Sequence, residues 1–440
     1  MGTAGLGTGG SGATGGVSTG GGAGTSGTGT GGSDTGPGGA SAGGSDAGGT
    51  GNGGTGAGGA GGVMGGGYPE NSGAECDVSA GQMAQNDNLP DPFAMNDGNR
   101  ISTMEQWTCR RNEIKKDIEE YEIGPKPEPP TVQASLSGNT LNVEVTTDAG
   151  SITLSSNVGN ASGAGPHCVA IGMNGNSSLI SGCVQVPFMH DQVVAYFQNG
   201  NQNQSDPFYQ VYPELWGQIG NYSAWSWGIS RLIDALEQVE DELGIDMTKI
   251  GVHGCSYAGK MALFGGAFDE RVALTVVQES GGGGINSWRT SQDFTTRTGT
   301  NIEKIDNTNY GWFKSSMQQL NPYSLPHDHD ELIAMIAPRA VVALGNRDYE
   351  WLGDESGYKS INAAREVWKA MGLEDRIGYD FTTGHTHCQA HQSQVDTVNA
   401  FVNKFLKGQD ADTNILIAPP ANGFDLDYTN VIDWQTPTLQ

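Results

Sequence analysis

The chain has 440 residues, with 22 basic and 49 acidic side chains and a formal charge of −27. This charge disfavours binding to nucleic acids, because proteins hold phosphate backbones with a surplus of Lys and Arg. No stretch approaches the roughly 18 consecutive apolar residues of a membrane helix. We therefore expect neither a nucleic-acid partner nor a membrane span.

Residues 1–67 consist almost entirely of Gly, Ser, Thr and Ala. Such a segment cannot bury enough apolar surface to offset its ordering entropy, so it is predicted to be a disordered linker to another module or a cell-surface anchor. No signal-peptide pattern follows Met1, which indicates that the natural N-terminus has been processed or trimmed. Residues 68–440 are long enough to form one large domain, with N-terminal and C-terminal extensions.

The six cysteines are even in number and show no Cys-x-x-Cys spacing. This pattern disfavours zinc and favours disulfides. Together with the linker and the acidity, it predicts a secreted or cell-surface protein. The alternative is a cytosolic enzyme with six reduced cysteines.

The first part of the domain is mixed in structure. Residues 104–121 are predicted to form a helix that is capped at Ser102 or Thr103, and the proline-rich segment 124–130 ends regular structure. Apolar side chains alternate over 131–155, which predicts antiparallel strands. Residues 166–172 are predicted to form a buried strand.

From about residue 220, strands alternate with helices. The predicted helices cover 224–243, 259–268, 361–371 and 395–406, and the predicted strands cover 249–253, 271–278, 339–344 and 376–381. This alternation predicts a mostly parallel sheet with helices on both faces, which is a three-layer αβα sandwich of the α/β class. Residues 408–440 are predicted to be an irregular tail.

A candidate nucleophile follows the strand 249–253. Ser256 stands in the sequence Gly254-Cys-Ser-Tyr-Ala-Gly259, directly before a predicted helix. A nucleophile elbow needs small residues around a serine at such a strand–helix turn, although Ala258 replaces the second glycine of Gly-x-Ser-x-Gly. The alternative is an ordinary strand–helix turn in which Ser256 only caps the helix.

Acids and histidines follow the later strands. Glu279 ends the strand 271–278, Asp348 follows the strand 339–344, and a loop after the strand 376–381 carries His385 and His387. The order serine, acid, histidine is that of the α/β-hydrolases, in which histidine activates the serine. A competing interpretation is a metal site formed by these histidines and residues 327–330. His-x-His in a loop is a weak metal signal, and a serine mechanism needs no metal or organic cofactor, so we expect neither.

Several segments resemble the glucuronoyl esterases, carbohydrate esterase family fifteen. The resemblance is carried by Gly254–Lys260 and Gln278–Gly284 and spans about residues 88–440. Further similar segments are 89–93, 120–125, 225–234, 337–339, 348–353 and 384–389. On this resemblance the chain is identified as a bacterial-type member with an α/β-hydrolase fold.

The resemblance implies a role for individual residues. Ser256 would be the nucleophile, His387 the base and Glu279 the acid, with Asp348 as the second or alternative acid that some bacterial members carry. It also implies one disulfide near the site and one near the N-terminus. The two remaining cysteines would form a third disulfide. The expected pairs are Cys255–Cys388, Cys76–Cys109 and Cys168–Cys183.

The substrate pocket departs from the family pattern. Lys260 and Trp351 match positions that contact the glucuronate, whereas Glu303 replaces a sugar-binding Gln and Asn309 replaces a Glu. Tyr257 replaces an Arg that helps to hold the oxyanion in the family. A phenol donates one neutral hydrogen bond and brings no charge, so oxyanion stabilisation is expected to be weaker or differently arranged.

The resemblance implies a monomeric, secreted serine carbohydrate esterase. Its substrate would be glucuronoxylan or another lignin–carbohydrate ester, cleaved at the ester that joins (4-O-methyl-)glucuronic acid on xylan to a lignin alcohol. One alternative is a divergent carboxylesterase that acts on another uronate or acyl ester. Another is a catalytically weak carbohydrate-binding relative that uses Trp351 as a platform.

Overall fold

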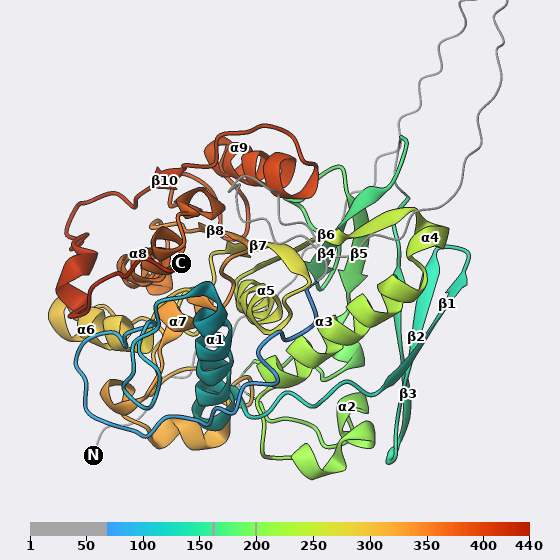
Figure 1. The fold of residues 1–440 in the computed structure, drawn as a ribbon, viewed down its shortest axis with the longest axis horizontal. Helices are drawn as coiled ribbons and strands as arrows, with labels where there is room; N and C mark the ends of the chain where they lie inside the picture. Colours follow the sequence, from blue (N-terminus) through green and yellow to red (C-terminus); the bar gives the residue numbers. More distant parts are fainter. Residues whose placement is uncertain (1–67, 161–162, 199) are drawn as a thin grey trace, which may run out of the picture. The chain divides into compact units, whose positions relative to one another are not determined.

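The computed structural model describes residues 68–160, 163–198 and 200–440 (Figure 1). The predicted linker, residues 1–67, lies outside this range. Within the described ranges, no helix combines the length and the apolar character that crossing a membrane requires.

The helices and strands largely follow the predicted pattern. The α-helices are α1 (Met104–Ile118), α2 (Pro207–Val211), α3 (Asn221–Gln238), α4 (Glu240–Leu243), α5 (Tyr257–Phe268), α6 (Trp288–Thr298), α7 (His329–Ala334), α8 (Asp354–Ala370) and α9 (Gln392–Phe401). The strands are β1 (Thr131–Ser137), β2 (Thr140–Thr147), β3 (Gly150–Asn157), β4 (His167–Met173), β5 (Val184–Phe188), β6 (Ile245–Cys255), β7 (Val272–Gln278), β8 (Ala340–Leu344), β9 (Ile377–Asp380) and β10 (Leu416–Ile417). Single turns of π-helix extend α1 to Ile123 and α9 to Leu406.

The central sheet has seven strands in the order β10-β9-β8-β7-β6-β4-β5, and all neighbouring strands run parallel. The predicted α/β class with a mostly parallel sheet is therefore confirmed. β6 lies between β4 and β7, with Gly172 beside His253 and Cys255 beside Gln278. Because parallel strands end at the same edge, the residues that follow β4, β6, β7 and β8 gather there.

Helices cover both faces of this sheet (Figure 1). Alternate residues of β7 point to opposite faces, so Val277 belongs to the large core under α3 and α5, whereas Leu274 and Val276 belong to a smaller core. Phe401 of α9 packs in that smaller core. Because both faces of the sheet are buried, the sequences of its strands are continuous apolar runs.

The antiparallel strands that were predicted within residues 131–155 form a separate three-stranded sheet, in the order β1-β2-β3. Leu141, Val143 and Val145 of β2 are fully buried, and the residues between them are more exposed. This alternation fits a sheet with one packed face and one solvated face. The packed face lies against α3.

The structure contains elements that were not predicted, namely β5, α2, α6 and α7, and α8 begins at Asp354 instead of residue 361. Two further differences concern the predicted helix 224–243 and the C-terminal tail. The helix predicted over 224–243 breaks at Val239, which leaves the helical region, and continues as the short α4 until Gly244 ends it in a left-handed conformation. The tail after residue 408 was predicted to be irregular, but β10 pairs with β9 at the edge of the sheet. In the same tail, Trp434 is buried against Phe93.

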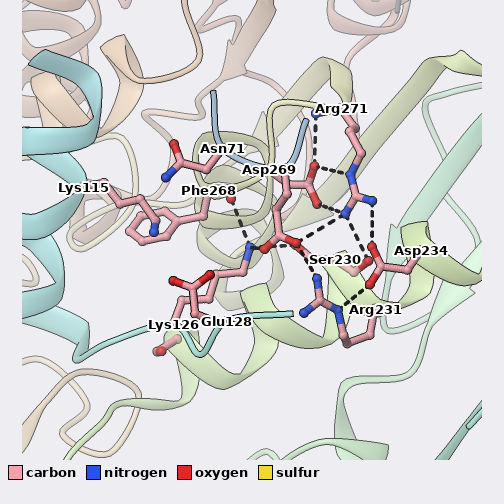
Figure 2. Close-up of polar contacts among 12 residues, drawn as sticks. Asn71, Lys115, Lys126, Glu128, Ser230, Arg231, Asp234, Phe268, Asp269 and Arg271 are labelled. Atoms are coloured by element: carbon pink, nitrogen blue, oxygen red, sulfur yellow. Dashed lines mark hydrogen bonds and ion pairs between the residues drawn. The ribbon is translucent and has the colours of Figure 1, made fainter. Parts of the chain in front are cut away.

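A buried network of ion pairs lies at the opposite end of the strands, where they begin. Figure 2 shows Arg271, just before β7, between Asp269 and Asp234, at 2.7 Å from each. Burial alone would raise the pKa of Asp269, but the charge and hydrogen bonds of Arg271 outweigh it and lower that pKa to about 2. Glu70 binds Lys126 at 2.6 Å and also pairs with Arg231, which secures the start of the described chain.

Candidate active site

Ser256 stands at the sharp turn between β6 and α5. Its backbone angles are φ 60° and ψ −127°, a conformation that non-glycine residues rarely adopt. A Cβ atom on Gly254 would lie 2.1 Å from the carbonyl oxygen of Ala258, and one on Gly259 would lie 2.5 Å from that of Gln278. The turn therefore requires glycine at 254 and 259 but accepts the small Ala258. It places the serine at the positive end of a 12-residue helix.

Glu279 and His387 lie in contact beside this turn. Glu279 directly follows β7, and its side chain is fully buried. Its Oε2 atom lies 2.7 Å from Nδ1 of His387 and also accepts the backbone N–H of Cys388 at 3.3 Å. A carboxylate at Nδ1 fixes the imidazole with its proton on that nitrogen, which leaves Nε2 as the basic atom.

The carboxylate of Asp348 binds a backbone N–H of the loop that carries His385 and His387. Its Oδ2 atom accepts the N–H of Gly384 at 2.7 Å, and its own N–H donates to Oδ1 of Asn346. His385 points away from the solvent, with Nε2 2.9 Å from the carbonyl oxygen of Thr382. Glu279 therefore contacts the side chain of His387, whereas Asp348 contacts only the backbone of the loop.

The three disulfides join Cys255 to Cys388, Cys76 to Cys109, and Cys168 to Cys183, which are the expected pairs. The first links the residue before Ser256 to the residue after His387, with Cα atoms 5.6 Å apart. A ring nitrogen of His387 lies within 4.8 Å of the Cys255 sulfur. Because both sulfurs are bonded to each other, this group offers no thiolate for a metal.

The other histidines considered for a metal are bound to carboxylates in the core. His327 and His329 both contact Glu122, at 3.0 and 2.8 Å. Burial would raise the pKa of Glu122, but the charge of His329 and two hydrogen bonds lower it to about 2. Asp328 caps α7 and pairs with Arg289 at 3.1 Å. The structure therefore holds His327, His329 and Asp328 in ion pairs with protein side chains.

Lys260 and Glu303 form an ion pair close to the nucleophile. Lys260 lies one turn along α5 from Ser256, is buried, and binds Oε2 of Glu303. The other oxygen of Glu303 accepts the hydroxyl of Thr308 at 2.6 Å. The ammonium group also lies 5.6 Å from the ring centre of Trp312. The positive charge of Lys260 is therefore balanced within the protein.

The ring of Trp351 packs beside the imidazole of His387. Its ring centre is 4.8 Å from that of the imidazole, and 49% of the residue is exposed. The glycine-rich loop after Glu279 passes between this segment and Glu303. A Cβ on Gly282 would lie 2.2 Å from the carbonyl oxygen of Glu303, and Gly281 lies against Leu352. The two candidate substrate-binding segments thus flank the loop that carries the acid.

Tyr257 points toward β4. Its hydroxyl oxygen lies 3.2 Å from Nδ2 of Asn174 and 3.2 Å from Nε2 of His190, and its ring lies 4.3 Å from that of Tyr196. A cavity of about 240 Å³ is lined by Asn174, Tyr257 and the Cys255–Cys388 disulfide. No local pattern could single out Asn174 or His190, because their contacts with Tyr257 join residues 83 and 67 positions apart.

Asp354 is a third residue near the site that no sequence pattern indicated. It begins α8 and is buried, with its carboxylate beside Gly345 at the end of β8. Burial, together with the charge of Glu279, raises its pKa to about 8. This acid is therefore neutral at pH 7.

The parallel sheet, the serine at the β6–α5 turn, and the order serine, acid, histidine define an α/β-hydrolase. A family profile described as "Glucuronyl esterase, fungi" matches residues 143–372. A protein named 4-O-methyl-glucuronoyl methylesterase, from Schizophyllum commune, is 38% identical, and the alignment covers 84% of this chain and 95% of that protein. This chain belongs to the glucuronoyl esterase family.

Solved structures agree with this assignment. A serine-to-alanine variant of the glucuronoyl esterase from Sporotrichum thermophile, in complex with methyl 4-O-methyl-β-D-glucopyranuronate, is 35% identical with a TM-score of 0.76. The match covers 83% of this chain and 100% of that one. A bacterial member from Caldicellulosiruptor kristjansonii is 27% identical with a TM-score of 0.64, and covers 76% of this chain and 94% of that one. The expected bacterial-type membership is therefore not supported, and the similarity points to the fungal type.

Proposed function

We propose that this protein is a serine esterase that hydrolyses esters of (4-O-methyl-)glucuronic acid, such as those that link xylan to lignin alcohols. Residues 68–440 form the esterase domain in this proposal. The observation that carries it is the 2.7 Å contact between Nδ1 of His387 and Glu279, beside the serine turn of a glucuronoyl esterase family member. The three disulfides support an extracytoplasmic location. The monomeric state and tethering through residues 1–67 stay predictions.

The reaction proceeds in two halves. Nε2 of His387 takes the proton of Ser256 as the serine oxygen attacks the ester carbonyl carbon. The backbone N–H of Tyr257, the residue after the nucleophile, donates to the oxyanion. His387 then gives its proton to the alcohol oxygen as the ester C–O bond breaks. Water, activated by His387, attacks the acyl-enzyme and releases the uronic acid and free Ser256.

Lys260, Glu303 and Trp351 form the substrate pocket in this proposal. The ester of a uronic acid is neutral, so its hydroxyls need hydrogen bonds rather than a net charge. Lys260 supplies a hydrogen-bond donor to these hydroxyls, and Glu303 balances its charge. The exposed ring of Trp351 offers an apolar face for the sugar ring.

A divergent ester specificity is the second candidate, because Tyr257 and Glu303 depart from the family pattern. A direct test compares a methyl or benzyl ester of glucuronic acid with a simple acetyl ester, for the parent enzyme and Ser256→Ala. Turnover of the uronate ester that is lost in Ser256→Ala supports the proposal. Turnover of the acetyl ester alone would keep the serine mechanism and reject the uronate substrate. Absence of serine-dependent turnover, with retention on glucuronoxylan, would instead favour a carbohydrate-binding relative.

A further inference from the structure

The backbone around the site has an unusual distribution of strain. Among the described residues, four non-glycine residues have a positive φ: Asn174, Ser256, Glu279 and Cys388. Three of these are the proposed nucleophile, its acid and the neighbour of the histidine. Asparagine adopts this left-handed region more readily than most residues, so the position of Asn174 beside these three residues is the reason to consider its role.

Asn174 lies beside the nucleophile turn. Gly172 of β4 pairs with His253 of β6, and both strands run in the same direction. Asn174 directly follows the last residue of β4, and it lines the same cavity as Cys255 and Tyr257. In α/β-hydrolases, the loop after this neighbouring strand supplies the second hydrogen-bond donor to the oxyanion.

The backbone of Asn174 cannot be that donor, because its N–H already donates to the carbonyl oxygen of Phe188 at 2.9 Å. Its side chain is better placed. Nδ2 carries two hydrogens, and one donates to the hydroxyl oxygen of Tyr257 at 3.2 Å. No other hydrogen bond within the described residues engages Nδ2, and Asn174 is exposed on the rim of the cavity that it shares with Tyr257 and Cys255.

The hydroxyl of Tyr257 has its own proton engaged elsewhere. A carboxylate oxygen of Asp191 lies 2.9 Å from Nδ1 of His190, and its negative charge favours the tautomer with the proton on Nδ1. Burial lowers the pKa of His190 and keeps the ring neutral, which makes Nε2 an acceptor. In that tautomer Nε2 accepts the Tyr257 hydroxyl at 3.2 Å, and the hydroxyl oxygen accepts from Asn174.

We propose that the side-chain amide of Asn174 is the second donor to the oxyanion, and that the Tyr257 hydroxyl positions this amide instead of binding the oxyanion. The inference rests on the proposed ester hydrolysis. As the carbonyl oxygen gains negative charge, it accepts one hydrogen bond from the Tyr257 backbone N–H and one from Asn174. The oxyanion site is then neutral, since the nearby cation Lys260 is paired with Glu303.

Asn174→Gly tests the amide with little disturbance, because glycine adopts the left-handed backbone without strain. Tyr257→Phe tests the hydroxyl and keeps the ring against Tyr196. Asn176→Gly, on the same cavity rim, is the control. Kinetics on methyl glucuronate should show that Asn174→Gly lowers kcat by about 10²-fold with KM nearly unchanged, the loss expected for one oxyanion donor. Asn174→Asp should lose at least as much, because its oxygens cannot donate.

Tyr257→Phe should lower kcat much less, by no more than about tenfold, since the amide remains. A loss in Tyr257→Phe as large as in Asn174→Gly would overturn the proposal, because the hydroxyl would then be the donor. Unchanged kcat in both Asn174 variants would also overturn it and leave the oxyanion to backbone groups. Melting temperatures separate these effects from unfolding. Failure of the proposed function itself would appear earlier, as a parent enzyme without serine-dependent turnover of the uronate ester.

Discussion

Oε2 of Glu279 lies 2.7 Å from Nδ1 of His387, in a contact between residues 108 positions apart in the chain. Asp348 lies in the loop after the neighbouring strand β8, and its carboxylate binds the backbone of Gly384. Two acids that look equivalent in the sequence therefore have different surroundings, and their replacement should have different consequences.

Glu279→Gln should lower kcat by about 10³- to 10⁴-fold, because an amide no longer fixes the proton on Nδ1 of His387. Asp348→Asn should lower it by less than about tenfold, because it weakens only a loop contact. Steady-state kinetics on a glucuronate ester distinguishes the two. A loss in Asp348→Asn equal to that in Glu279→Gln would show that Asp348 is the acting acid.

Glu303→Gln should strengthen substrate binding. The amide leaves Lys260 without its charged partner, so the ammonium group can donate fully to a substrate hydroxyl. We expect a decrease in KM of about fivefold, which corresponds to about 1 kcal/mol for a hydrogen bond, with little change in kcat. Lys260→Met serves as the opposite control and should raise KM. An increase of KM in Glu303→Gln would mean that the carboxylate itself binds the sugar.

Removal of the Cys255–Cys388 disulfide should cost more stability than removal of Cys168–Cys183. The two bridges close segments with sequence separations of 133 and 15. Chain entropy then predicts losses of about 5 and about 3 kcal/mol in the free energy of unfolding. Denaturant unfolding of the two paired Cys→Ser variants measures the difference. Only the first pair should also lower kcat, because it joins the serine and histidine loops.

Asp354→Asn should stabilise the protein at neutral and mildly alkaline pH. The folded state keeps this acid protonated up to about pH 8, whereas the unfolded chain ionises it near its ordinary pKa. Between these values the folded state binds more protons, so the parent loses stability as pH rises, by about 1.4 kcal/mol for each unit of pKa difference. Thermal unfolding at pH 4 and pH 8 should show a variant whose stability declines less. An equal decline in both proteins would contradict this role of Asp354.

Glu122→Gln should destabilise the core at pH 7 by about 3–5 kcal/mol, because His327 and His329 lose their buried carboxylate. The pKa of Glu122 is held at about 2, below its ordinary value. Its contribution is therefore present above about pH 4 and is lost as pH falls toward 2. Acid unfolding followed by circular dichroism should show a smaller drop over this window in the variant. A parent whose stability is flat from pH 5 to 2 would refute the prediction.

Local patterns predicted much of the fold. The strand, turn and helix around Ser256 follow one another within a few residues, and the Gly254 and Gly259 contacts explain why the sequence pattern is so recognisable. The alternation of β2 likewise reports its one buried face. The short β10 was not predicted, because two exposed residues carry no periodic signal and their pairing with β9 depends on tertiary structure.

The candidate site was only partly predictable from the residues. Each acid could be placed at a strand end, but the choice of partner for His387 depends on loop geometry that no spacing reveals. The contacts of Tyr257 with Asn174 and His190 are long-range. Burial decides the protonation of Asp354, and the position of that residue at the start of α8 gives no sign of it.

The segment that carries Glu303 lies between α6 and residue 314 and contributes no strand to the central sheet. The proposed nucleophile, acid and base, by contrast, lie at the sheet edge or in the loop bridged to it by a disulfide. Natural selection could therefore alter which sugars are accepted by exchanging residues in one loop while the hydrolytic apparatus stays intact. The same separation makes residues 299–313 the natural target for a combinatorial library aimed at new ester substrates.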